Sequence, residues 1–378
     1  MPASPSRSAW VDNLRTTMVL LVVNMHACVT YSHVGSWYIN ESPEPDLAVK
    51  MPFLFWQGHL QSFFMGLLFF LAGVFAPGAC QRRGPGGFVR ERLLRLGAPA
   101  LLYMVLIHPF MVYVLLRQPD WPPSLQLYGR YLTSSRVLSG SGPLWFAIAL
   151  LLFSAVFAAW RTFRPAPANV ETPPPRGRAV FGFALLLVSA TFALRLWWPI
   201  DSSLFNMQLC FFAQYIAAFA VGVYAGRHGW LDAFASSSLP ARAGWVALVG
   251  GPVLLLTVLV LGDRAKPGDF TVFKGGWHPQ AFGLAAWEQL TGLGLALGAL
   301  ALFRRRVNFD GPGARWLSQH SFGVYVLHAP VLVALTPLLR PLPGGPFVKV
   351  PLLTVLGLVA SYGLAWLARL VPGLRRIL

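Results

Sequence analysis

The first apolar stretch of the chain reads Ala9-Trp-Val-Asp-Asn-Leu-Arg15-Thr-Thr-Met-Val-Leu-Leu-Val-Val-Asn-Met-His26-Ala-Cys-Val-Thr30. As an α-helix it is long enough to cross a hydrocarbon core of about 30 Å, yet it contains Arg15 and His26. At about 100° per residue, the steps between them make three turns with about 20° left over. Both side chains therefore lie on one helix face, with a rise of roughly 16 Å between them. Ionisable groups inside a spanning helix are costly and usually mark a function.

The composition of the whole chain is that of a membrane protein. Of its 378 residues, 56% are hydrophobic and only 11% are charged, and the mean hydropathy is +0.57. A soluble domain is typically about 25% charged. The formal charge of +17 would suit a nucleic-acid binder, but the basic residues stand in short clusters between apolar runs, where membrane topology places them. We therefore exclude nucleic acid as a partner.

Apolar runs predict about ten transmembrane helices and no separate soluble domain, so residues 1–378 form a single all-α polytopic membrane domain. Breakers such as Arg83-Gly-Pro-Gly-Gly87 and Pro173-Pro-Pro175 separate the runs. The expected spans are roughly 10–32, 51–76, 94–116, 143–160, 179–197, 207–226, 244–261, 280–303, 321–339 and 349–370. With the N-terminus in the cytoplasm, about twice as many Lys and Arg face the cytoplasm as face outside, so both termini are predicted to be cytoplasmic.

Arg15 and His26 are open to an ordinary and to a functional interpretation. Arg15 lies about one turn inside the cytoplasmic boundary, where it could snorkel to the interface or pair with Asp12 at i,i+3. His26 could form a structural hydrogen bond between helices. Together on one face, they predict a lane from the cytoplasmic surface to the middle of the membrane, with a cation at its mouth and a base at its end.

A second basic cluster precedes the third span. Arg92 and Arg95 are i,i+3 neighbours and would project to the same side of a helix. Arginine binds phosphate in a bidentate manner, so the pair could clamp a phosphate-rich donor, although ordinary positive-inside charge explains it equally well in isolation. Combined with the predicted lane between Arg15 and His26, the pair favours a donor that has phosphates at one end and a long flexible arm.

These motifs resemble those of the acyltransferase-3 family of integral-membrane O-acyltransferases. Four patterns, in the family's order, carry the resemblance over nearly the whole chain: Asp12-x-Leu14-Arg15 followed by His26, Arg92-x-x-Arg95, Pro143-Leu-Trp145-Phe146, and Ser321-Phe-Gly-Val-Tyr325-Val-Leu-His328-Ala-Pro330. Two further segments are most similar to the glucan-biosynthesis-protein-C branch, whose members add succinyl groups to periplasmic glucans: His33-Val-Gly-Ser-Trp37-Tyr-Ile-Asn40 and Phe69-Phe-Leu-Ala-Gly73.

The chain also departs from the family pattern. Many members have glycine after the motif arginine, where this sequence has Thr16. Many carry a further extracytoplasmic hydrolase-like domain, and no such segment follows the last span here, so we expect the membrane domain itself to complete the transfer to the acceptor.

The resemblance implies acyl transfer across the membrane of a bacterial cell, in the inner membrane. Acyl-CoA would be the donor substrate, with its phosphates on Arg92, Arg95 and Arg15, and no cofactor would be bound permanently. His26 would deprotonate an acceptor hydroxyl or carry the acyl group itself, since an imidazole can serve as base or nucleophile at neutral pH. The acceptor would be a carbohydrate. An acetyl or succinyl group and either route for His26 remain open, as does a homo-oligomeric state.

Other polar residues are candidates for support or acceptor binding. Ser321, Tyr325 and His328 would share a helix face and either position His26 or make interhelical contacts. Trp145 belongs to the motif that opens the fourth span. Glu288 lies inside the eighth span, roughly 12 Å from its outer end, where it could orient His26, bind the acceptor or form a structural ion pair. The three cysteines lack metal-type spacing, so no metal site is expected.

Two other classes of function compete with the enzyme. A secondary transporter could use Arg15, His26 and Glu288 as a proton relay, and a polysaccharide-export partner would not need His26 at all. The transporter would move its substrate unmodified and would have no use for a cytoplasmic phosphate clamp. The motif order favours the acyltransferase.

Overall fold

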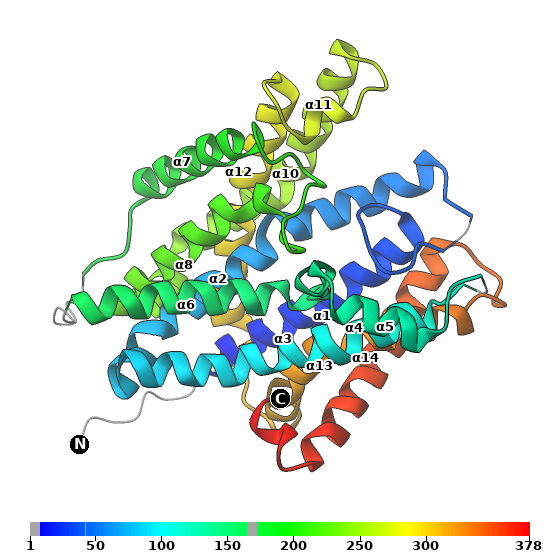
Figure 1. The fold of residues 1–378 in the computed structure, drawn as a ribbon. Helices are drawn as coiled ribbons and strands as arrows, with labels where there is room; N and C mark the ends of the chain where they lie inside the picture. The colour runs from blue at the N-terminus through cyan, green and yellow to red at the C-terminus, as the bar shows by residue number, and fades with distance from the viewer. Residues whose placement is uncertain (1–7, 42, 119, 165–171) are drawn as a thin grey trace.

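The computed structural model describes residues 8–41, 43–118, 120–164 and 172–378, and within these the fold is an all-α bundle (Figure 1). Figure 1 places α13 and α14 beside α1, while α10 and α12 pair at the far side of the bundle. The helices are α1 (Ala9–Ser32), α2 (Leu47–Arg92), α3 (Ala98–Leu102), α4 (His108–Phe110), α5 (Ser124–Leu132), α6 (Trp145–Phe163), α7 (Gly177–Arg195), α8 (Phe212–Arg227), α9 (Trp230–Ser236), α10 (Ser238–Ala265), α11 (Thr271–Lys274), α12 (Pro279–Arg306), α13 (Pro312–Leu338) and α14 (Pro346–Leu370).

The number of long apolar helices agrees with the predicted spans. In the part of the chain that the structure describes, nine helical stretches are long and apolar enough to cross a membrane, and one of them, Leu47–Leu115, has 69 residues. Gly84 interrupts this stretch with φ 70° and ψ 163°, outside the helical region, so it comprises two helices. The prediction of about ten spans in an all-α membrane fold is confirmed.

The third span has an irregularity that the sequence analysis did not predict. Leu93–Gly97 and Tyr103–Ile107 are π-helical turns, and each is followed closely by a proline, Pro99 or Pro109. Proline has no N–H to donate to the preceding turn, and a local π turn is a common way to accommodate such a gap in a helix.

Contacts between connecting segments show which of them share an end of the bundle. Asn13 Nδ2 donates to Val307 O and Phe309 O, at 2.8 and 3.0 Å, so the start of α1 lies beside the α12–α13 connection. At the other end, Arg340 pairs with Glu41 at 2.8 Å and links the segment after α1 to the turn after α13. Segments predicted to lie on the same side of the membrane are thus neighbours.

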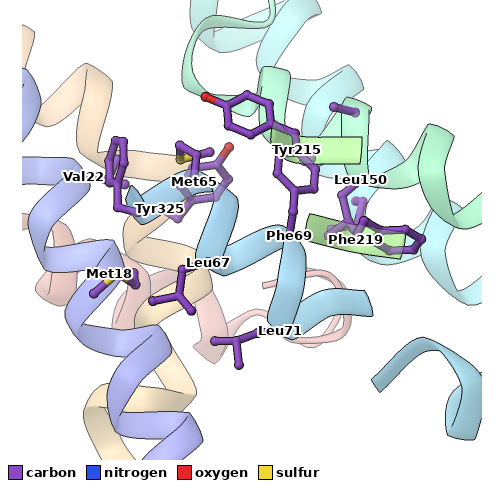
Figure 2. Close-up of a cluster of buried hydrophobic side chains, with 14 of the residues drawn as sticks. Met18, Val22, Met65, Leu67, Phe69, Leu71, Leu150, Tyr215, Phe219 and Tyr325 are labelled. Carbon is purple, nitrogen blue, oxygen red and sulfur yellow. The ribbon is translucent and has the colours of Figure 1, made fainter. Parts of the chain in front are cut away.

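α2 is the central helix, and its middle turns are packed on both sides (Figure 2). Met65, Leu67, Phe69 and Leu71 are buried between α1 and the α6–α8 side, and Figure 2 shows them flanked by Met18 on one side and by aromatic rings on the other. Helices in lipid associate through close packing because the tails are as apolar as the side chains. These contacts therefore hold α1, α6 and α8 against α2.

Glycines set the closest of these contacts, between α2 and α8. A Cβ at Gly73 would lie within 3.0 Å of the Phe219 carbonyl oxygen, and one at Gly222 would clash in the same way with Phe70. The obstructing atoms belong to helix backbone, which cannot rotate away. Small residues at such crossings allow the backbones to approach.

We expect Gly222→Val to lower the free energy of unfolding by about 1–3 kcal/mol or more, because the added methyl groups must separate two backbones. Thermal denaturation of the purified protein in detergent measures this. Gly250→Ala in α10 is the matched control, since nothing lies within 4 Å of a Cβ there. Equal melting of both variants would show that the α2–α8 crossing is not tightly constrained.

Candidate functional site

His26 lies on α1 and opens into a cavity of about 650 Å³ that is formed by several helices. The cavity is also lined by Trp37, Tyr38, Trp145, Tyr215, Glu288 and Tyr325. His26 Nδ1 is buried and has no hydrogen-bond partner among the described residues. An imidazole in a cavity with an uncommitted nitrogen can accept a proton or attack an electrophile.

Trp37 covers one face of the His26 ring. The two rings stack with centroids 3.6 Å apart and planes 16° from parallel. Trp37 comes from the segment after α1, which the Glu41–Arg340 pair holds against the rest of the bundle. The stack leaves the ring edge, and so the nitrogens, as the reactive part of the imidazole.

His328 on α13 lies on another side of His26. The centroids of the two imidazoles are 5.3 Å apart. His328 is fully buried, and its Nδ1 lies 2.7 Å from Tyr325 O. A carbonyl only accepts hydrogen bonds, so this Nδ1 carries the proton and Nε2, which has no partner among the described residues, is the acceptor nitrogen. The structure thus places His328 next to His26.

Tyr325 ties α13 to the start of α6. Its hydroxyl donates to Pro143 O, which precedes Trp145 in the motif. Trp145 in turn stacks on Tyr215 of α8, with centroids 5.7 Å apart. The sequence motifs of the fourth and ninth spans therefore meet at one wall of the cavity.

Tyr38 adds a hydrogen-bonded group to the same cavity. Its hydroxyl lies 2.9 Å from His108 Nδ1 and 3.3 Å from the Tyr103 hydroxyl. Burial raises the pKa of Tyr38 to about 12, so it remains protonated at neutral pH. Such a hydroxyl can orient a polar substrate without contributing a charge.

The residues predicted to bind the donor lie near the start of α1 and around the end of α2. The Arg15 guanidinium lies over the Phe75 ring, 4.6 Å from its centroid, and it is close enough to Asp12 and to Arg92 for their charges to interact. Arg92 lies over the Phe88 ring at 5.2 Å. Arg95 is exposed and pairs with Glu91 at 3.5 Å. Arg92 is thus partly buried within range of the Arg15 charge, whereas Arg95 is exposed.

Glu288 forms a buried ion pair with Arg195, which the sequence analysis did not single out. Arg195 NH2 donates to Glu288 Oε2 at 2.6 Å, and neither side chain is more than 6% exposed. Gln289 donates to the other carboxylate oxygen at 2.9 Å. No local pattern links residues on α7 and α12, so only their packing identifies this pair. Of the three roles considered for Glu288, the structure shows the ion pair.

Among the described residues, no group of three His, Cys, Asp or Glu side chains is arranged to hold a metal ion. The site is thus an imidazole that lines a membrane-embedded cavity within an all-α multi-pass membrane protein. The acyltransferase-3 family model, which describes an acyltransferase domain, matches residues 8–369, and the chain belongs to this family. The comparisons found no match among curated proteins or solved structures.

Proposed function

We propose that this membrane acyltransferase moves an acetyl or succinyl group from cytoplasmic acyl-CoA to a hydroxyl of an extracytoplasmic or membrane-borne carbohydrate. The carrying observation is His26, which has an uncommitted nitrogen in the cavity and shares a face of α1 with Arg15, three helical turns away. The proposal includes a bacterial inner-membrane location with both termini in the cytoplasm, as the basic residues indicate.

Two routes of transfer fit this arrangement. In one, His26 takes the proton of the acceptor hydroxyl, the oxygen attacks the thioester carbonyl, the C–S bond breaks and the thiolate receives the proton. In the other, an imidazole nitrogen attacks the thioester first, CoA leaves as the thiol, and the acyl-histidine passes the group to the hydroxyl. Either route ends with one ester and one free CoA.

The aromatic lining of the cavity supports a sugar acceptor. Trp37, Trp145 and Trp287 line it together with amide side chains such as Gln57 and Gln61. Flat rings present faces to the C–H side of a sugar, while amides bond to its hydroxyls. Resemblance to the glucan-biosynthesis-protein-C branch points to a succinyl donor and a glucan acceptor.

Release of free thiol from a panel of acyl-CoAs by the purified protein, with and without candidate glucans, tests the proposal. We expect one short-chain donor to be consumed with stoichiometric formation of an ester on the acceptor. If no donor binds or reacts, while proteoliposomes accumulate an unmodified solute with protons, the chain transports its substrate and the proposal is wrong.

Arg92 and Arg95 should contribute unequally to donor binding. Arg92→Gln is expected to raise KM for acyl-CoA by about tenfold to a hundredfold, the cost of losing a charged hydrogen bond, with kcat nearly unchanged. Arg95→Gln is the matched control, and because Arg95 is exposed and already paired with Glu91, we expect less than about a fivefold change. Steady-state kinetics with the preferred donor measures both, and a larger effect at Arg95 would contradict the assignment.

A further inference from the structure

An apolar groove separate from the catalytic cavity lies between α7, α8, α12 and the middle of α2. It has a volume of about 270 Å³, and its lining includes Phe70, Val180, Phe183, Ala218, Leu293 and Leu297. It shares no lining residue with the cavity that contains His26. Gln214 separates the two, since its Nε2 donates to Ser62 O at 2.7 Å and to Gln289 Oε1 at 3.2 Å.

A basic hollow of about 530 Å³ adjoins one end of this groove. It is lined by Arg304, Arg305 and Arg306 at the end of α12, with Ser236, Asn308 and Phe309. The two hollows share no lining residue, but α9 and α12 line both. Leu300 lines the groove one turn before Arg304 on α12, and Phe234 lines it two residues before Ser236 on α9.

The charges at this end are mostly unneutralised. Arg304 Nε pairs with Asp232 at 3.0 Å. Arg305 instead donates to the carbonyls of Ser236 and Ser237, at 3.1 and 2.6 Å, which holds the guanidinium in place without cancelling its charge. Arg306 has no partner among the described residues. An anion entering the hollow would therefore meet two free positive charges.

The basic hollow is not an extension of the donor lane. Asp232, beside Arg304, also accepts a hydrogen bond from Trp10 Nε1 at 3.2 Å. Trp10 and Arg15 are five residues apart on α1, which places their side chains about 140° apart around the helix. The hollow and Arg15 thus lie on different faces of α1.

We propose that this composite site binds an anionic phospholipid, with the phosphate headgroup in the Arg305–Arg306 hollow and an acyl chain in the apolar groove. A basic pocket at the cytoplasmic end of transmembrane helices is a typical headgroup site, and here the two helices that line it, α9 and α12, also line a groove with an almost wholly apolar lining. A free nucleotide would leave the groove unfilled, and a neutral lipid would leave the arginines unpaired.

Native mass spectrometry of the full-length protein in detergent tests this site, with phosphatidylglycerol and phosphatidylcholine of identical chains as probes. We expect phosphatidylglycerol to bind about tenfold more tightly, since each arginine near a lipid phosphate contributes on the order of a fewfold in affinity. The double variant Arg305→Gln/Arg306→Gln should remove this preference. Arg375→Gln/Arg376→Gln, an adjacent pair near the C-terminus, is the matched control and should retain it.

Two further measurements test binding of the acyl chain in the groove and distinguish a lipid headgroup from the phosphate of a free nucleotide. Ala218→Trp places an indole in the groove and should weaken binding of both lipids at least fivefold, while CoA release remains as in the unmodified protein. Adenosine 3′,5′-bisphosphate should not displace the bound lipid. Equal binding of the two lipids by the unmodified protein, an unchanged preference in the double variant, or displacement by the nucleotide would each overturn the proposal. The lipid-binding readouts do not depend on acyl transfer, so the proposed function stands or falls separately.

Discussion

His26→Ala is expected to lower the rate of acyl transfer by about 10²–10⁴-fold, because removal of a positioned base or nucleophile typically costs that much. The measurement is CoA release with the preferred donor and acceptor, together with ester formation on the acceptor. The substitution removes the imidazole, which lines the cavity and whose Nδ1 has no hydrogen-bond partner among the described residues. The donor should still bind, since Arg15 and Arg92 remain.

Histidine substitutions elsewhere serve as controls for this result. His278→Ala changes a histidine that does not line the cavity, and we expect transfer within about twofold of the unmodified enzyme, as for a surface substitution. His328→Asn should have an intermediate effect, because His328 packs beside His26 without lining the cavity. If His328→Asn removed all transfer while His26→Ala retained most of it, the roles of the two histidines would be reversed.

The same preparation distinguishes the two routes. Acid quenching after incubation with donor alone, followed by peptide mass spectrometry, detects an acyl group on residue 26 if the imidazole is the nucleophile. An unmodified peptide, with CoA release that requires acceptor, selects direct attack by the hydroxyl. His26→Ala provides the blank for this experiment.

Glu288→Leu should destabilise the fold by about 3–5 kcal/mol, because it leaves the buried Arg195 guanidinium without its counter-charge. Arg195 is fully buried, and its Nε and NH1 already have no hydrogen-bond partner among the described residues. Thermal denaturation in detergent and the yield of monodisperse protein measure the effect. A variant that melts like the unmodified protein would show that water or another group solvates Arg195.

The double variant Arg195→Met/Glu288→Leu removes both charges and should recover much of the lost stability, since an apolar pair of similar volume often replaces a buried ion pair at little cost. Its activity then tests the role of Glu288. Transfer close to that of the unmodified enzyme in the folded double variant would fit a structural ion pair. Its loss would show that the carboxylate acts on acceptor or proton, as the acceptor-binding and relay interpretations require.

The helices and the common face of Arg15 and His26 were predictable because they depend on local properties of the chain. Apolar runs of sufficient length become helices in lipid, where every backbone group must be hydrogen-bonded internally. The period of the helix then fixes which residues share a face. The motif order also pointed to the family, which the match over residues 8–369 shows.

The membership of the cavity was less predictable. Trp37 was part of a recognised segment, but nothing in its spacing indicated that its ring stacks on His26 at 3.6 Å. Arg92 and Arg95 share a predicted face, yet a π-helical turn begins at Leu93, and Arg95 is exposed and paired with Glu91. Local periodicity assumed a regular α-helix across this point.

The sequence by itself thus determined the membrane class, the number of spans and the shared α1 face of Arg15 and His26, all of which follow from residue type and short-range spacing. The tertiary structure decided that Arg195 neutralises Glu288, that His328 packs beside His26 and that Tyr325 joins α13 to Pro143. These contacts connect segments far apart in the chain. They depend on how closely the helices approach, and backbone contacts at glycines such as Gly73 and Gly222 set that distance.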